Sequence, residues 1–193
     1  MKTKLFVPLL LLVSTALAQP GPYLTLSTGS ATFNPEDSGS QTRRRDSVAV
    51  GYTITNMLAV EASYFQIQEA TYSPVGAPGP GFFDPNYYPT RSGTRLTGYT
   101  VGPVLRWQLS DRVTVFTRQM FASIKAKETT WFTGGATYDR NTTLGAWQPS
   151  VGIDFRLGGR LPLSLGLEVS HAVVSKYQVK DLTAVLVNFS YGF

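Results

Sequence analysis

Few side chains in this sequence could act as an acid, a base or a nucleophile in a catalytic site. There is no cysteine, and His171 is the single histidine. The absence of thiols excludes a disulfide framework, a thiolate metal site and a catalytic cysteine, and one imidazole is too few for the usual zinc sites. Ala172 and Val173 follow His171, so no serine stands two residues away to complete a nucleophile–base pair on one strand face. We therefore predict no catalytic residue, no metal and no cofactor.

Five charged residues lie within segments whose polar and apolar residues alternate, and these residues are Glu61, Arg106, Arg118, Asp154 and Glu168. A carboxylate cluster could serve acid–base catalysis. Here the carboxylates stand on separate segments and are mixed with arginines, and a buried charge needs a partner. The pattern favours ion pairs inside the protein over catalysis.

Three consecutive arginines, Arg43, Arg44 and Arg45, fall in a region that we expect to be a long loop. Guanidinium groups bind phosphate through paired hydrogen bonds. The triplet is therefore a candidate contact for lipopolysaccharide phosphate, with a solvated run of charge as the alternative.

The elements that position these residues are predicted to be β-strands, because alternation with a period of two dominates the sequence. We expect eight strands at about Tyr23–Thr32, Ser47–Thr53, Leu58–Gln66, Leu96–Leu109, Val113–Lys125, Thr143–Arg156, Leu163–Val173 and Thr183–Phe193. The connections near Thr55, Ser110 and Gly158 are short. The long connections are expected at Asn34–Asp46, Gln68–Thr94, Ala126–Thr142 and Val174–Leu182. An even number of strands with short turns at one end and long loops at the other is typical of outer-membrane barrels. The second long loop is rich in Pro, Gly and aromatic residues, and is either a recognition surface or a mobile loop.

The composition indicates which face of the sheet points outward. Charged residues make up 15% of the sequence, whereas soluble domains average about 25%. The polar face consists mostly of Gly, Ala, Ser and Thr, which suits the narrow interior of a small barrel. We therefore expect the apolar face to contact lipid and His171 to lie near the outer interface. A soluble lipocalin-like carrier with its apolar face inside is the alternative.

The N-terminus has the three parts of a secretory signal. Lys2 and Lys4 are basic, an apolar run follows, and Ala16-Leu17-Ala18 forms a cleavage site. We expect residues 1–18 to be the signal peptide and residues 19–193 to form the barrel domain, with a retained anchor helix as the alternative. The formal net charge of +5 includes the two signal lysines, so the mature chain is nearer +3. That charge is too mild to indicate nucleic-acid binding.

Three stretches resemble the OmpA/OmpX-type small outer-membrane β-barrels. The resemblance covers most of the mature chain. GYTITNMLAVEASY (Gly51–Tyr64) resembles the second hairpin, WQLSDRVTVFTR (Trp107–Arg118) a later hairpin, and VLVNFSYGF (Val185–Phe193) the last strand. The resemblance implies an all-β fold, namely an eight-stranded antiparallel up-and-down transmembrane barrel. It also implies that Glu61 and Arg118 form an interior ion pair, and that the barrel-assembly machinery reads the terminal Phe193 with Tyr191 and Phe189.

The function expected from this resemblance is that of a non-enzymatic, monomeric outer-membrane protein in contact with outer-membrane lipids and lipopolysaccharide. Both mature termini and the short turns are expected on the periplasmic side. Its role would be envelope integrity, surface interaction through the long loops, or a narrow pore. An outer-membrane enzyme that modifies lipid A remains an alternative.

Overall fold

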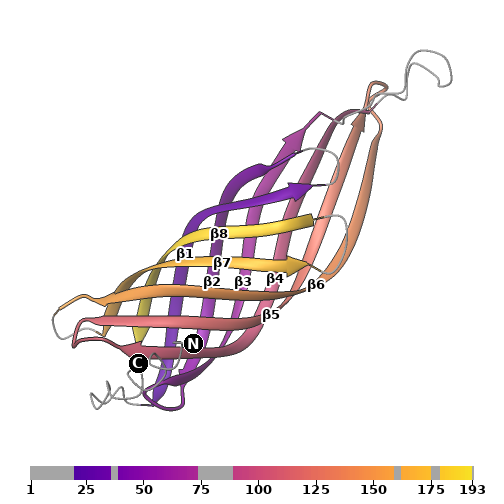
Figure 1. The fold of residues 1–193 in the computed structure, drawn as a ribbon. Coiled ribbons are helices and arrows are strands. Elements are labelled where there is room, and N and C mark those ends of the chain that lie inside the picture. Colours follow the sequence, from indigo (N-terminus) through magenta and orange to yellow (C-terminus); the bar gives the residue numbers. More distant parts are fainter. Residues whose placement is uncertain (1–19, 36–38, 74–88, 159–161, 175–178, 193) are drawn as a thin grey trace, which may run out of the picture.

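The computed structural model describes residues 20–35, 39–73, 89–158, 162–174 and 179–192, and all eight predicted strands are present. They are β1 (Gly21–Pro35), β2 (Gln41–Thr53), β3 (Leu58–Tyr72), β4 (Pro89–Gln108), β5 (Val113–Phe132), β6 (Thr137–Arg156), β7 (Leu163–Val174) and β8 (Val179–Gly192). Each strand pairs with the next along the chain, and β8 pairs with β1, so the sheet is a closed antiparallel barrel (Figure 1). The predicted signal peptide lies outside the described residues. In the described part of the chain, no helix is long and apolar enough to span a membrane.

The strand register fixes the tilt of the barrel. Starting from Leu26 on β1 and stepping through paired residues across β2, β3, β4 and β5, the path reaches Gly145 on β6. Stepping the other way across β8 and β7, it reaches Phe155 on the same strand. The two ends are ten residues apart, which is the stagger of a tilted eight-stranded barrel whose interior holds only side chains.

The faces of the strands follow the predicted alternation. The outward face carries large apolar side chains, among them Leu26, Val48, Val50, Tyr52, Val60, Tyr64, Tyr99, Val101, Leu105, Phe121, Trp147, Val151, Phe155, Leu165, Leu167, Val169, Val185, Val187 and Phe189. The small and polar residues of the same strands point inward. This apolar-out arrangement is that of a membrane barrel, and it is the opposite of the lipocalin-like alternative.

The polar side chain of Gln119, on the outward face, forms a hydrogen bond with a neighbouring residue of the same strand. Gln119 on β5 lies outward and pairs with Pro149 on β6. Its amide donates to Thr117 Oγ1 at 3.4 Å, and Thr117 Oγ1 donates to the carbonyl of Ser150 at 2.7 Å. These bonds lower the cost of placing an amide in an apolar band, and they accompany the inward placement of the neighbouring Arg118.

The strands continue well beyond the ends that the sequence predicted. The expected loop Asn34–Asp46 is largely strand, because β2 begins at Gln41. The expected loop Ala126–Thr142 is a hairpin with a tight turn, in which Phe132 N donates to the carbonyl of Ala136 at 3.0 Å and Gly135 has a φ of 79°. The prediction ended each strand where apolar residues gave way to polar ones. Cross-strand pairing satisfies the backbone in water as well as in lipid, so the ladder continues past that point.

The longest strands are β4, β5 and β6, which have 20 residues each, whereas β2 has 13 and β7 has 12. The barrel is therefore taller on one side, and the long strands rise as a wall beyond the rest (Figure 1). Most of the Pro/Gly-rich second loop, residues 74–88, lies outside the described residues.

The interior is built of layers. Nearest the short turns, Tyr23, Ala59, Val104 and Phe116 form a small apolar cluster. At the opposite end a larger apolar cluster contains Phe33, Phe65, Ile67, Leu96, Ile124, Leu144, Leu182 and Leu186, together with several alanines. Glu61, Arg118 and Glu168 lie between these clusters, whereas Arg106 and Asp154 pair with Phe116 and Thr114 nearer the short turns. A charged layer held between two apolar layers is shielded from water on both sides.

Candidate functional site

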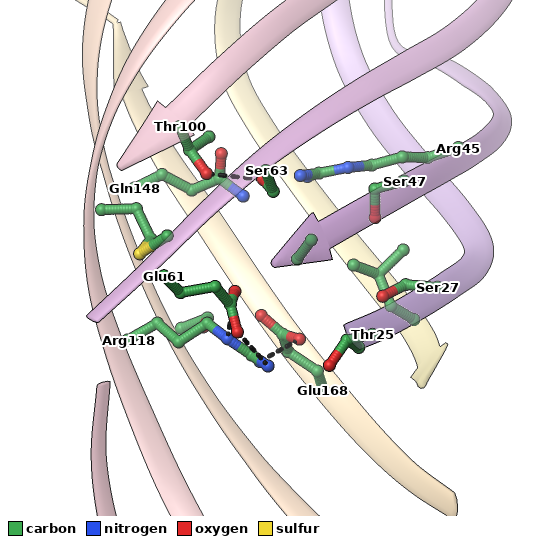
Figure 2. A pocket seen from close by; sticks show the side chains of 14 residues that line it. Thr25, Ser27, Arg45, Ser47, Glu61, Ser63, Thr100, Arg118, Gln148 and Glu168 are labelled. Atoms are coloured by element: carbon green, nitrogen blue, oxygen red, sulfur yellow. Dashed lines mark hydrogen bonds and ion pairs between the residues drawn. The ribbon is translucent and has the colours of Figure 1, made fainter. Parts of the chain in front are cut away.

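Arg118 is the centre of the charged layer, and it lies between two carboxylates from other strands. Its Nε is 3.0 Å from Glu61 Oε1 on β3, and its Nη1 contacts Glu168 Oε2 on β7. The three side chains are buried, with exposed fractions of 7%, 3% and 8% (Figure 2). The structure therefore brings together the predicted Glu61–Arg118 pair and adds Glu168 to it.

Neutral side chains also donate hydrogen bonds to the two carboxylates. The hydroxyl of Tyr23 donates to Glu61 Oε2 at 3.0 Å, and the amide of Asn188 donates to Glu168 Oε2 at 2.9 Å. Ionised groups in a dry interior are tolerated only when they are paired and hydrogen-bonded in this way. The network joins β1, β3, β5, β7 and β8, so it ties together strands that are not neighbours in the sheet.

The guanidinium of Arg118 also stacks on an aromatic ring below it. Its carbon lies 4.3 Å from the centre of the Phe116 ring. Gly152 on the adjacent β6 makes room for that ring, because a Cβ at this position would overlap the Phe116 side chain. Glycine is needed here for close approach rather than for an unusual backbone angle. The packing fixes Arg118 in a single position.

Arg106 and Asp154 also point inward, as predicted, but they stand apart from this triad. The guanidinium of Arg106 lies 4.3 Å from the ring centre of Tyr23, and Asp154 lies against Gly166 of β7. Among the described residues, neither forms an ion pair. The five predicted charged residues thus come from five different strands, β3 to β7, and all of them point into the barrel.

The structure corrects the interpretation of Arg45. This residue belongs to β2 rather than to a loop, and its side chain points into the barrel with an exposed fraction of only 3%. Its guanidinium lies 4.4 Å from the ring centre of Phe65, and its Nη1 donates to Ser170 Oγ at 3.5 Å. A lipopolysaccharide phosphate outside the barrel cannot reach it, so the prediction of a phosphate contact is wrong for Arg45.

The other two arginines of the triplet lie on β2 near the rim. Arg43 is half-buried, and its Nε donates to the carbonyl of Glu69 at 3.2 Å. Arg44 points outward and forms an exposed ion pair with Asp46 at 2.9 Å. Neighbouring residues of a strand point to opposite faces, so three consecutive arginines cannot act as one patch.

His171 lies on the outward face of β7, exposed, with its Nδ1 2.9 Å from the hydroxyl of Thr183 on β8. Phe189 lies on the outward face of β8, and Tyr191, on the same face near the strand end, is half-buried. Phe193 lies outside the described residues, so its predicted role in assembly stays a prediction.

A small cavity remains beside the charged layer, lined among others by Ser27, Ser63, Gln148 and Ser150 (Figure 2). Its volume of about 30 Å³ is that of a water molecule or two. The lumen is therefore filled, and within the described residues no group of three His, Cys, Asp or Glu side chains is placed to hold a metal ion.

Sequence reasoning missed Tyr23, Arg45, Gln148 and Asn188 as members of the interior network. The sequence did contain a signal for Arg45. If the predicted strand Ser47–Thr53 is extended by two residues toward the N-terminus, Arg45 falls on the same inward face as Ser47, Ala49 and Gly51. Asn188 also had such a signal, because it lies between the outward residues Val187 and Phe189, whereas Tyr23 stands at the start of its strand, where alternation is a weak guide.

No family model matches this sequence, and no curated protein sequence matches it. Solved structures are similar in fold. Neisserial surface protein A has a TM-score of 0.63 at 14% identity, over 90% of this chain and 97% of that one. Ail, the attachment invasion locus protein of Yersinia pestis, in complex with the heparin analogue sucrose octasulfate, has a TM-score of 0.57 at 12% identity, over 91% and 99%.

The N-terminal β-barrel domain of Pseudomonas aeruginosa OprF has a TM-score of 0.50 at 9% identity, over 91% of this chain and 100% of that one. These similarities are of fold alone, because the identities lie between 9% and 14%. Together with the closed register and the apolar outward face, they show that the chain has the fold of the small eight-stranded outer-membrane β-barrels.

Proposed function

We propose that this chain is a non-enzymatic outer-membrane protein that acts by surface interaction through the wall formed by β4, β5 and β6. The observation that carries the proposal is the length of these strands. Each has 20 residues, whereas about 9–11 residues cross the hydrocarbon at a tilt. About half of each strand is therefore available outside the membrane. The short turns and both mature termini lie on the periplasmic side in this proposal.

The projecting part of the wall carries more cations than anions among the described residues. The charged side chains are Arg91, Arg95, Lys125, Lys127 and Arg140 against Glu128 and Asp139. Arg91 stacks on Trp131 at 5.4 Å. A rigid surface of this composition suits a polyanionic partner. The heparin analogue bound by Ail, which shares the fold, supports a sulfated polysaccharide as the first probe.

The filled lumen argues against the pore alternative, since a cavity of about 30 Å³ between apolar layers offers no continuous water path. His171 contacts Thr183, but no carboxylate among the described residues bonds to the imidazole. This arrangement lacks the third group that orients a catalytic base, which supports a non-enzymatic role.

A shortened hairpin tests the proposal. Residues 130–138 would be replaced by Asn-Gly, which closes a two-residue turn between the paired Thr129 and Asp139. Cells that express the shortened protein should bind to a heparin-coated surface less than cells that express the wild type, with equal amounts of folded barrel on a heat-modifiability gel. Equal binding by the two strains would contradict the role of the wall.

A further inference from the structure

The outward row of β5 contains two polar side chains inside the apolar band. Thr117 and Gln119 stand between Val115 and Phe121 in this row. The hydroxyl of Thr117 donates to the carbonyl of Ser150 at 2.7 Å. The amide of Gln119 lies 3.4 Å from the same hydroxyl oxygen, which is longer than the usual range of about 2.7–3.2 Å. Thr117 is therefore well bonded within the barrel, whereas Gln119 is bonded only weakly.

The amide of Gln119 keeps hydrogen-bonding groups that the barrel does not use. A glutamine side chain has two N–H donors and a carbonyl oxygen that accepts. In the part of the chain that the structure describes, the long bond to Thr117 is the only hydrogen bond of this side chain. Lipid tails offer neither donors nor acceptors, and an amide without partners is costly in such a medium. We therefore expect this amide to bond to a polar group of another molecule in the bilayer.

Two prolines flank Gln119 on the neighbouring strands, since β5 lies between β4 and β6 (Figure 1). Pro149 of β6 pairs with Gln119, and Pro103 of β4 stands on its other side in the register. A proline has no N–H to donate to a ladder. The pairing of β4 with β5 skips residues 102–103, and the pairing of β6 with β7 skips residues 148–149. The backbone ladder is thus interrupted on both sides of the amide, at a depth where lipid replaces no lost bond.

A second copy of the chain has the chemistry that this amide needs. Two copies in one membrane share their orientation, so a two-fold axis between them runs along the membrane normal. A residue beside that axis meets its own copy at the same depth. An amide is complementary to itself, because the N–H of each glutamine can donate to the carbonyl oxygen of the other. Polar side chains join membrane-spanning segments in the same way.

The cations of the wall do not oppose such a contact. Lys125 and Lys127 follow Gln119 in the outward row of β5, and they would repel their copies if the two β5 strands ran side by side. Strands of small barrels are tilted by about 35–45° from the barrel axis. Two β5 strands that face each other across the two-fold axis therefore cross steeply at one point. With the crossing at Gln119, the lysines of the two copies diverge above it.

We propose that two copies of this chain associate in the membrane through the outward face of β5, with a reciprocal pair of hydrogen bonds between their Gln119 amides. The contact covers the level at which Pro103 and Pro149 interrupt the ladder. This dimer replaces the monomer expected from the sequence. The inference is independent of the proposed function, because it requires neither a polyanionic partner nor a particular orientation of the barrel.

Counting monomers and dimers of the full-length mature protein in phosphatidylcholine vesicles tests the interface. A dye on Asp111→Cys, in a short turn, allows single-molecule photobleaching over a range of protein-to-lipid ratios. Gln119→Leu should raise the dissociation constant of the dimer roughly fivefold to tenfold, as expected for two hydrogen bonds of the strength measured between membrane helices. Gln119→Asn keeps an amide and should weaken the dimer less. The matched control is Thr28→Val, which removes an outward polar group on β1, four strands away from β5.

Folding of each variant is checked by heat modifiability, and Gln119→Leu should fold because it places an apolar side chain on the lipid face. A wild type that is monomeric at every ratio would overturn the proposal. Dimerisation of Gln119→Leu equal to that of the wild type would overturn it as well.

Cross-linking in cells locates the interface without removing the amide. The chain has no cysteine, so a single introduced thiol reports only its own contacts. Thr117→Cys, which leaves Gln119 intact, should form disulfide-linked dimers on mild oxidation of outer membranes. Val187→Cys, on the outward face of β8, should not. Equal cross-linking at the two positions would indicate random collision and refute an interface at β5.

Discussion

At the scale of single residues, the buried charges around Arg118 are the most constrained feature of the molecule. One guanidinium serves two carboxylates that lie on β3 and β7. The partners differ in their remaining bonds, since Glu61 also accepts from Tyr23 and Glu168 from Asn188. Removing Arg118 therefore leaves two carboxylates without their cation, whereas removing one carboxylate leaves Arg118 paired with the other.

Arg118→Met should destabilise the barrel by about 3–5 kcal/mol, because it leaves two carboxylates buried without their cation. Glu61→Gln should cost less, because Arg118 keeps Glu168 and the amide can still accept from Tyr23. Urea unfolding of the protein in phospholipid vesicles measures both values. Arg112→Met, at an exposed position in a short turn, is the matched control.

The coupling between Glu61 and Arg118 is a separate expectation. Replacing both residues should cost less than the sum of the two single changes, with a coupling of about 0.5–3 kcal/mol for groups in contact. A double-mutant cycle on the same unfolding assay measures it. Additive effects would show that the 3.0 Å contact contributes nothing to stability.

At the scale of the strand, alternation decides the environment of every side chain. Val187 and Leu186 are adjacent on β8, yet Val187 is 43% exposed on the outward face and Leu186 is 3% exposed in the lumen. The interior neighbour of Leu186 across the strand is Glu168. The two positions therefore report separately on the lipid and on the interior.

Val187→Arg should destabilise the barrel by about 2–4 kcal/mol, the cost of an arginine near the midplane of the bilayer. Leu186→Arg should act through overpacking of the lumen. A spin label at residue 187 should be accessible to lipid-soluble relaxation agents, and a label at residue 186 should not. Reversed accessibility would show that the faces are swapped.

At the scale of the whole molecule, closure of the sheet and filling of the lumen act together. Closure removes free strand edges, which lipid could not satisfy. The ten-residue stagger sets an interior that the apolar clusters and the charged layer fill. In the proposed function, a barrel of this kind is a stable support for its projecting wall.

Planar-bilayer recordings of the wild type should therefore show little or no conductance. The described side chains leave a cavity of about 30 Å³ beside the charged layer, and buried apolar clusters lie toward both ends of the barrel. A barrel of known pore activity inserted under the same conditions is the positive control. Large and stable single-channel steps would contradict the filled interior and favour the pore.

Assembly of the whole barrel in cells should depend on Phe193. Deleting this residue should lower the yield of folded protein in the outer membrane more than it impairs refolding into detergent, because the resemblance implies that the terminal aromatic residue is a recognition signal. Phe189 and Tyr191 precede it on the outward face of β8. An unchanged yield in cells would argue that the signal lies elsewhere.

The sequence by itself determined the local features of this protein. Alternation with a period of two sufficed to predict eight strands, because each strand buries one face and exposes the other. It also indicated an interior position for Arg118, since the reverse would put a full charge in the apolar band. The choice between an apolar-out and an apolar-in barrel followed from the small polar residues of the inward face.

The tertiary structure decided what depends on distant strands. Strand ends were predicted from hydrophobicity, but the ladder continues wherever a neighbour supplies partners, so Arg45 became an interior residue of β2. The third member of the ion network, Glu168, lies 50 positions from Arg118, and only the stagger of the closed barrel brings the two together. No local pattern records such contacts, because register between distant segments is fixed by packing and closure rather than by either segment alone.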